Sequence, residues 1–70
     1  MQKEIKIILN GKEHSVPLKT TLEDLLESLK LDRSAIVIEM NEAVVDKQAC
    51  GAIPLSPGDI IEILQFVGGG

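Results

Sequence analysis

The first part of the chain alternates apolar and polar side chains in the manner of a β-hairpin. Ile5 and Ile7 stand at every second position, and this spacing places both on one face of a strand. Asn10-Gly11 follows, a pair typical of a type I′ turn, in which both central residues take positive φ. We expect residues 12–16 to return antiparallel and to end at Pro17, which has no N–H for a strand ladder.

A helix is predicted next, because leucines recur at the spacing of one helical face. These leucines are Leu22, Leu25, Leu26 and Leu29. Thr20 and Glu23 match a capping box, in which the glutamate reaches back to the first free N–H, so we expect a helix of about three turns from here. Glu23, Asp24 and Glu27 lie near the positive end of the helix dipole, and we interpret them as a solvated face rather than as paired catalytic carboxylates.

The remainder of the chain predicts more strands. Apolar and β-branched residues favour strands at residues 35–40, 43–45 and 60–67. Residues 46–55 have no regular period and predict a loop over one end of the sheet. Ser56-Pro57-Gly58-Asp59 is typical of a turn.

The order strand, strand, helix, strand, strand, strand defines the expected fold class. A single helix has to cover one face of the sheet, and the right-handed crossover rule then favours a mixed sheet of four to five strands. This is the α+β arrangement known as the ubiquitin-like β-grasp. We expect a β-grasp domain over residues 1–67 and a flexible C-terminal glycine tail over residues 68–70.

Composition narrows the classes of function. The chain has 70 residues, is 44% hydrophobic with Phe66 as its one aromatic residue, and carries a net charge of −4. Such a chain is long enough for one small aliphatic core and is a poor binder of nucleic acid. The single cysteine, Cys50, fits a reducing compartment, and no apolar run reaches membrane-spanning length. We therefore expect a cytoplasmic protein.

The last residues suggest a C-terminus whose carboxylate can enter the active site of another protein. Gly68, Gly69 and Gly70 have no side chains, so this backbone fits narrow channels and could carry a carboxylate about 10 Å beyond the domain. If Ile61 and Ile63 face the helix, then Leu64 and Phe66 lie on the outer face of the sheet. We interpret Leu64, Phe66 and Val67 as a partner interface. The alternatives are an inert stub and two apolar residues that a loop covers.

Several segments together resemble the ThiS family, the sulfur carriers of thiamine biosynthesis. The resemblance is carried by residues 56–63, by Phe66-Val67-Gly68-Gly69-Gly70, by residues 39–45 and by the opening strand with Asn10-Gly11. It implies a carrier rather than an enzyme, with no catalytic residue and no metal or cofactor of its own. A ThiF-type adenylating enzyme would activate the Gly70 carboxylate with ATP and magnesium. A cysteine desulfurase would supply the sulfur of a thiocarboxylate, and a ThiG-type thiazole synthase would receive it.

Other interpretations of the same residues stay open. A carrier of this type could serve molybdopterin synthesis or tRNA thiolation, although molybdopterin-type carriers tend to be longer. A ubiquitin-like protein modifier and an inert β-grasp binding module are the alternatives from other classes. Cys50 is interpreted as a buried packing residue rather than a sulfur relay, and His14 as a solvated surface residue without metal-ligand partners.

Overall fold

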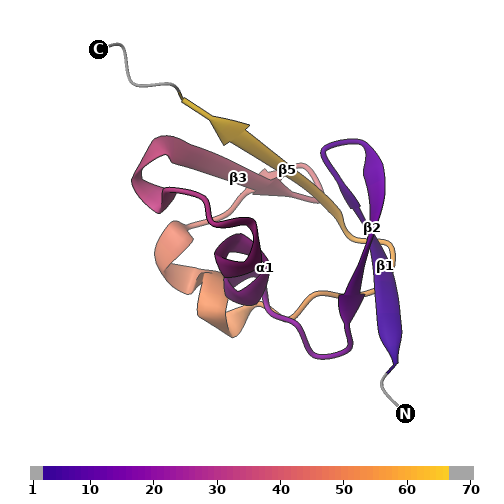
Figure 1. Ribbon diagram of the computed structural model, residues 1–70. Helices are drawn as coiled ribbons and strands as arrows, with labels where there is room; N and C mark the ends of the chain where they lie inside the picture. Colours follow the sequence, from indigo (N-terminus) through magenta and orange to yellow (C-terminus); the bar gives the residue numbers. More distant parts are fainter. Residues whose placement is uncertain (1–2, 67–70) are drawn as a thin grey trace.

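A computed structural model describes residues 3–66 of the chain. Within this range the strands form a five-stranded sheet in the order β2-β1-β5-β3-β4, in which β1 and β5 are parallel and the other neighbours antiparallel (Figure 1). The elements are β1 (Glu4–Leu9), β2 (Lys12–Pro17), α1 (Leu22–Leu29), the 3₁₀ helix η1 (Arg33–Ala35), β3 (Ile36–Met40), β4 (Ala43–Val44), the 3₁₀ helix η2 (Lys47–Ala52) and β5 (Ile60–Gln65). This arrangement confirms the predicted ubiquitin-like β-grasp.

The hairpin turn adopts the predicted conformation. Asn10 has a φ of 49° and Gly11 a φ of 82°, as a type I′ turn requires. The turn sets the register of β1 against β2, with Leu9 opposite Lys12 and Ile7 opposite His14. The side chains of Ile5 and Ile7 in β1 fall on the face of the sheet that α1 covers, and both are buried there.

Helix α1 begins one residue later than the sequence predicts, and it is shorter. Its N-cap is Thr21, whose side chain accepts from Asp24 N at 3.1 Å, while Thr21 N donates to the Asp24 carboxylate at 3.0 Å. The prediction that Glu23 completes the capping box with Thr20 is therefore wrong. Thr20 is engaged outside the helix, where its hydroxyl donates to the carbonyl of Pro17 at 2.6 Å. The helix has 8 residues, about two turns instead of three.

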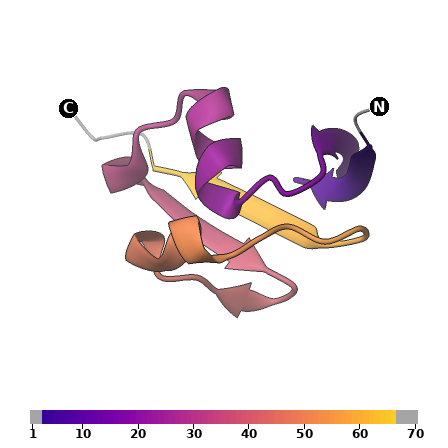
Figure 2. The same cartoon turned by 90° about the horizontal axis from the view of Figure 1, so that it is seen from below.

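The core lies between α1 and one face of the sheet, as the two layers in Figure 2 show. Leu22, Leu25 and Leu26 are at most 1% exposed. They pack with the inward residues of four strands, with one residue of η2 and with one residue after η2; these are Ile5, Ile7, Val16, Ile36, Ile38, Ile61, Ile63, Cys50 and Leu55. Aliphatic side chains at periods of two and 3.6 thus produce one continuous core, as the sequence pattern predicts.

The segment predicted as an irregular loop contains the ordered helix η2. Asp46 caps it by accepting from Gln48 N at 2.9 Å, just as Asp32 caps η1 by accepting from Ser34 N at 3.0 Å. The segment is joined to α1 through Leu22 N, which donates to the carbonyl of Ile53 at 2.9 Å. The prediction of an irregular loop is therefore wrong for most of this stretch.

Candidate functional site

Strand β5 separates the core from the predicted interface by the alternation of its side chains. On the inner face Ile61 is 0% and Ile63 is 7% exposed, whereas Leu64 is 53% and Phe66 is 58% exposed. No loop among residues 3–66 covers either outer side chain to the extent of burying it. The prediction that Leu64 and Phe66 point outward is confirmed; their role as an interface remains a prediction.

The outer face is apolar near Phe66 and acidic further back along β5. Val37 of β3 lies opposite Leu64, and Glu39 lies opposite Glu62 in the next outward pair. We call Val37, Leu64 and Phe66 the outer patch. An apolar patch bordered by carboxylates favours a partner surface with an apolar centre and a basic margin.

Two asparagines hold β5 at the ends of the neighbouring hairpins. Asn10 and Asn41 both have left-handed backbones, with φ of 49° and 53°. The side-chain oxygen of Asn10 accepts from Ile63 N at 2.8 Å, and that of Asn41 accepts from Ile60 N at 2.9 Å. Each side chain thereby pairs with β5 where its own strand has ended. The Asn-Gly pair predicted the first turn from sequence, but nothing in the pattern indicated the contact with a strand 53 residues further on.

The remaining predicted site residues lie outside the described part of the chain. They are Val67, Gly68, Gly69 and Gly70. The structure therefore brings together only Leu64 and Phe66 of the predicted set. The last described backbone contact before them is Phe66 N, which donates to the carbonyl of Ala35 at 2.8 Å.

Cys50 is a packing residue, as predicted. Its side chain is 0% exposed within the core, and its thiol lies 3.8 Å from the carbonyl of Asp46 as a weak donor. Burial raises the pKa of the Cys50 thiol above its ordinary value, so the reactive thiolate is disfavoured. A relay of sulfur through this atom would need the core to open.

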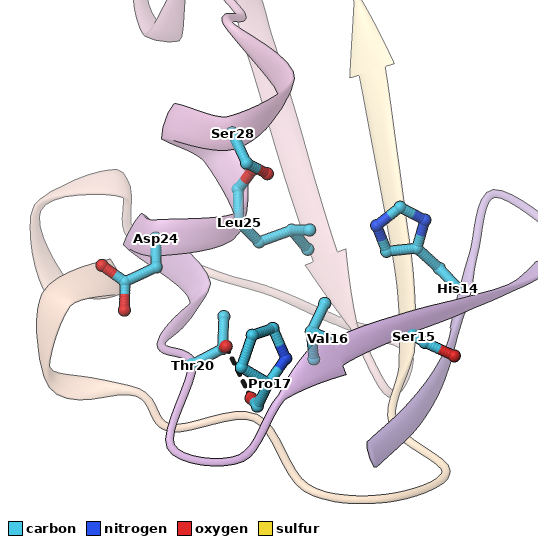
Figure 3. A pocket seen from close by; sticks show the side chains of 8 residues that line it. All are labelled: His14, Ser15, Val16, Pro17, Thr20, Asp24, Leu25 and Ser28. Carbon is cyan, nitrogen blue, oxygen red and sulfur yellow. Dashed lines mark hydrogen bonds between the residues drawn. The ribbon is translucent and has the colours of Figure 1, made fainter. Parts of the chain in front are cut away.

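His14 lies on β2 beside a shallow groove between that strand and α1 (Figure 3). The groove has a volume of about 460 Å³, and Val16 and Leu25 point toward one another across it. His14 is half-buried, so the prediction of a fully solvated surface residue is wrong for the extent of its exposure. Within residues 3–66 no group of three His, Cys, Asp or Glu side chains is placed to hold a metal ion. In the same range no helix is long and apolar enough to span a membrane.

Comparison with known proteins identifies relatives along nearly the whole chain. The model of the ThiS family matches residues 3–70. The chain is 38% identical to the sulfur carrier protein ThiS of Bacillus subtilis over 89% of this chain and 96% of that protein. The crystal structure of the thiamine biosynthesis protein ThiS from Geobacter metallireducens superposes with a TM-score of 0.79 at 30% identity, over 94% of this chain and 100% of that one.

A second kind of relative is much longer. The chain is 42% identical to a thiazole synthase of Magnetococcus marinus over 94% of its own length, but it spans only 20% of that protein. A thiazole synthase of Paramagnetospirillum magneticum matches at 33% identity, again over 20% of the relative. In these proteins a domain like this one is one part of a longer polypeptide. The match of the family model and the full-length similarity to the Bacillus carrier show that the chain belongs to the ThiS family.

Proposed function

We propose that this chain acts as the sulfur carrier of thiamine biosynthesis and carries sulfur on the carboxyl group of Gly70. The observation that supports this most directly is the similarity to the Bacillus subtilis sulfur carrier over 96% of that protein. The exposed side chains of Leu64 and Phe66, which lie close to Gly70 in the sequence, give the proposal a physical basis. According to this proposal, the chain is a cytoplasmic co-substrate of other enzymes and has no catalytic residue of its own.

The proposed chemistry begins with activation of a poor electrophile. A ThiF-type enzyme uses ATP and magnesium to join the Gly70 carboxylate oxygen to AMP, and pyrophosphate leaves. A sulfur nucleophile that derives from a cysteine desulfurase then attacks the acyl carbon, and AMP departs with the carboxylate oxygen. When that nucleophile is a persulfide, the first product is an acyl disulfide. A second thiol, acting as the two-electron reductant, then forms a disulfide with the donor sulfur and releases the thiocarboxylate. Glycines at 69 and 70 leave the acyl carbon open to attack, because no Cβ shields it.

The outer patch has an energetic role in this scheme. Phe66 is already hydrogen-bonded to Ala35, so the backbone left to fix in an active site is that of residues 67–70, at about 1–2 kcal/mol for each residue, or about 4–8 kcal/mol in all. Contacts of the glycines alone offer little apolar area to offset this cost. We assign that task to Leu64 and Phe66, which are more than half exposed, together with Val67.

The sulfur acceptor in this proposal is a thiazole synthase. Support comes from the two relatives of that name, in which a domain like this one is fused to a longer chain. Fusion keeps a carrier and its acceptor at high effective concentration. Transfer to molybdopterin or tRNA would use the same activated terminus with another acceptor, and attachment to lysines would make the chain a protein modifier.

The test measures the intact mass of the chain purified from its own cell. After incubation with the adenylating enzyme, ATP and a sulfur source, we expect the mass gain of one oxygen-to-sulfur exchange, located on Gly70 by fragmentation. Conjugates of higher mass would indicate a modifier, and an unchanged mass beside a working control carrier would refute the carrier function. Addition of one alanine after Gly70 should abolish the exchange, whereas the same addition before Met1 should leave it intact.

A further inference from the structure

Among residues 3–66, one edge of β5 is left without a backbone partner at the carboxyl end of the strand. On the β3 side, the carbonyl of Ile60 accepts from Asn41 N, and Phe66 N donates to the carbonyl of Ala35. Backbone groups alternate between the two edges of a strand, so residues 61, 63 and 65 turn theirs toward β1. On that side the carbonyl of Ile61 accepts from Asn10 N at 2.9 Å.

Strand β1 ends before it can cover the rest of this edge. Its register with β5 stops at Leu9 opposite Ile61, and the Asn10 side chain then takes the N–H of Ile63. Beyond that point no residue from 3 to 66 pairs with the carbonyl of Ile63 or with the N–H and carbonyl of Gln65. The other edge stays bonded to β3 as far as Phe66, so the backbone here is held extended.

The side chains at this end of β5 do not cover the open edge from outside, because Leu64 is 53% exposed and Gln65 is exposed as well. An unpaired stretch of extended backbone flanked by exposed side chains is a template for strand addition. A strand added here would continue the line of β1, with Leu64 of the outer patch beside it on one face of the enlarged sheet.

We propose that the open edge at Ile63 and Gln65 receives an extended segment of the thiazole synthase, which pairs with β5 while Gly70 is in its active site. This inference rests on the proposed function and specifies how the partner docks. Phe66 stands four residues before Gly70, so an enzyme that holds Gly70 comes within about 14 Å of this edge. We take this enzyme to be thiazole synthase, because two relatives of that name contain a domain like this one within a longer chain. Backbone pairing adds affinity without any further side chain.

Two substitutions at Gln65 distinguish the contribution of its backbone N–H to binding from that of its side chain. Gln65→Pro removes the unpaired N–H, and proline favours the extended conformation that Leu64 already has. Gln65→Ala removes the exposed side chain and keeps the N–H. We expect Gln65→Ala to bind thiazole synthase within about twofold of the unaltered chain. Gln65→Pro should bind about tenfold more weakly, which corresponds to about 1.4 kcal/mol. Equal affinities of the two variants would overturn the proposal.

A second measurement does not depend on how well the proline variant folds. Hydrogen exchange of the unaltered chain should show the Gln65 amide unprotected when free and protected in the complex. Protection that appears elsewhere in the complex but not at Gln65 would also overturn strand addition. Formation of the Gly70 thiocarboxylate, measured in the same preparation, tests the carrier function separately. If the thiocarboxylate forms but neither Gln65→Pro nor the exchange of the Gln65 amide shows the expected change, only the docking mode is refuted. If the thiocarboxylate does not form, the proposed carrier function is refuted.

Discussion

Replacement of Phe66 by aspartate should weaken partner binding much more than it lowers stability. Phe66 is 58% exposed in the free chain. For a phenylalanine surface of about 200 Å², about 115 Å² remains to be covered by a partner. At about 25 cal/mol per Å² this burial contributes about 3 kcal/mol, or about a hundredfold in Kd. The aspartate adds a desolvation cost in the complex, so the loss should be at least this large.

The stability cost of the same substitution should be smaller. About two fifths of the Phe66 surface is already covered within the domain, which limits the loss to about 2 kcal/mol, an upper bound because the unfolded chain also buries part of it. Val44→Asp is a matched control. Val44 is 72% exposed and lies opposite Glu39, on the same outer face but at the far end from Phe66. It should leave binding unchanged.

The assay combines urea unfolding with titration calorimetry against the adenylating enzyme. We expect Phe66→Asp to remain folded without urea, with a loss of unfolding free energy of at most about 2 kcal/mol, and to lose binding heat at concentrations that saturate the unaltered chain. Equal losses of folding and binding free energy would mean that Phe66 belongs to the core and would refute the reasoning. A similar loss of binding from Val44→Asp would show that added negative charge, and not the lost apolar contact, is responsible.

Three further predictions concern the parts that hold the domain together. Asn10→Ala should lower the free energy of unfolding by about 1–2 kcal/mol in urea titrations, because it removes the acceptor for Ile63 N and places alanine at positive φ; an unchanged midpoint would contradict this. Thr21→Ala should cost about 1 kcal/mol in the same assay through loss of the N-cap, and Asp24→Ala a smaller amount, whereas an effect only from Glu23→Ala would restore the capping box predicted from sequence. Stability should fall as the pH rises above about 9, because the unfolded Cys50 thiol then loses its proton while the raised pKa keeps the folded thiol protonated; Cys50→Ala should remove this part of the pH dependence in urea titrations between pH 7 and 10.

Local chemistry was sufficient to predict most of the fold. The alternation around Ile5 and Ile7, the Asn10-Gly11 turn and the leucine stripe each depend on contacts within a few residues, and each is present in the structure. The helix start was missed because the sequence offers two overlapping capping boxes, Thr20 with Glu23 and Thr21 with Asp24. The choice between them is tertiary, since the carbonyl of Thr20 accepts from Leu55 N at 2.8 Å.

The order of η2 depends on contacts that no local pattern contains. Lys47 donates to the carbonyl of Arg33 at 2.7 Å, and Arg33 pairs with Glu23 of α1 at 3.1 Å. Cys50 of η2 is also buried in the core. The aspartate before each 3₁₀ helix was the available signal, because an Asp side chain that bonds an N–H two residues later starts such a turn. The same limit applied to the site, where the outward direction of Leu64 was predicted and the role of Asn10 was not.

The alternation of β5 explains how so small a domain can be stable and still present a binding surface. Ile61 and Ile63 of the strand point into the core, whereas Leu64 and the adjoining Phe66 stay exposed. Their backbones divide in the same way, with the even residues bonded to β3 and Gln65 left unpaired among the described residues. A change at the side chain of Ile61 or Ile63 should therefore act on folding, and a change at the side chain of Leu64 or Phe66 or at the Gln65 amide should act on association. Because the side-chain period is two, insertion of one residue within β5 would exchange these faces and remove both functions at once.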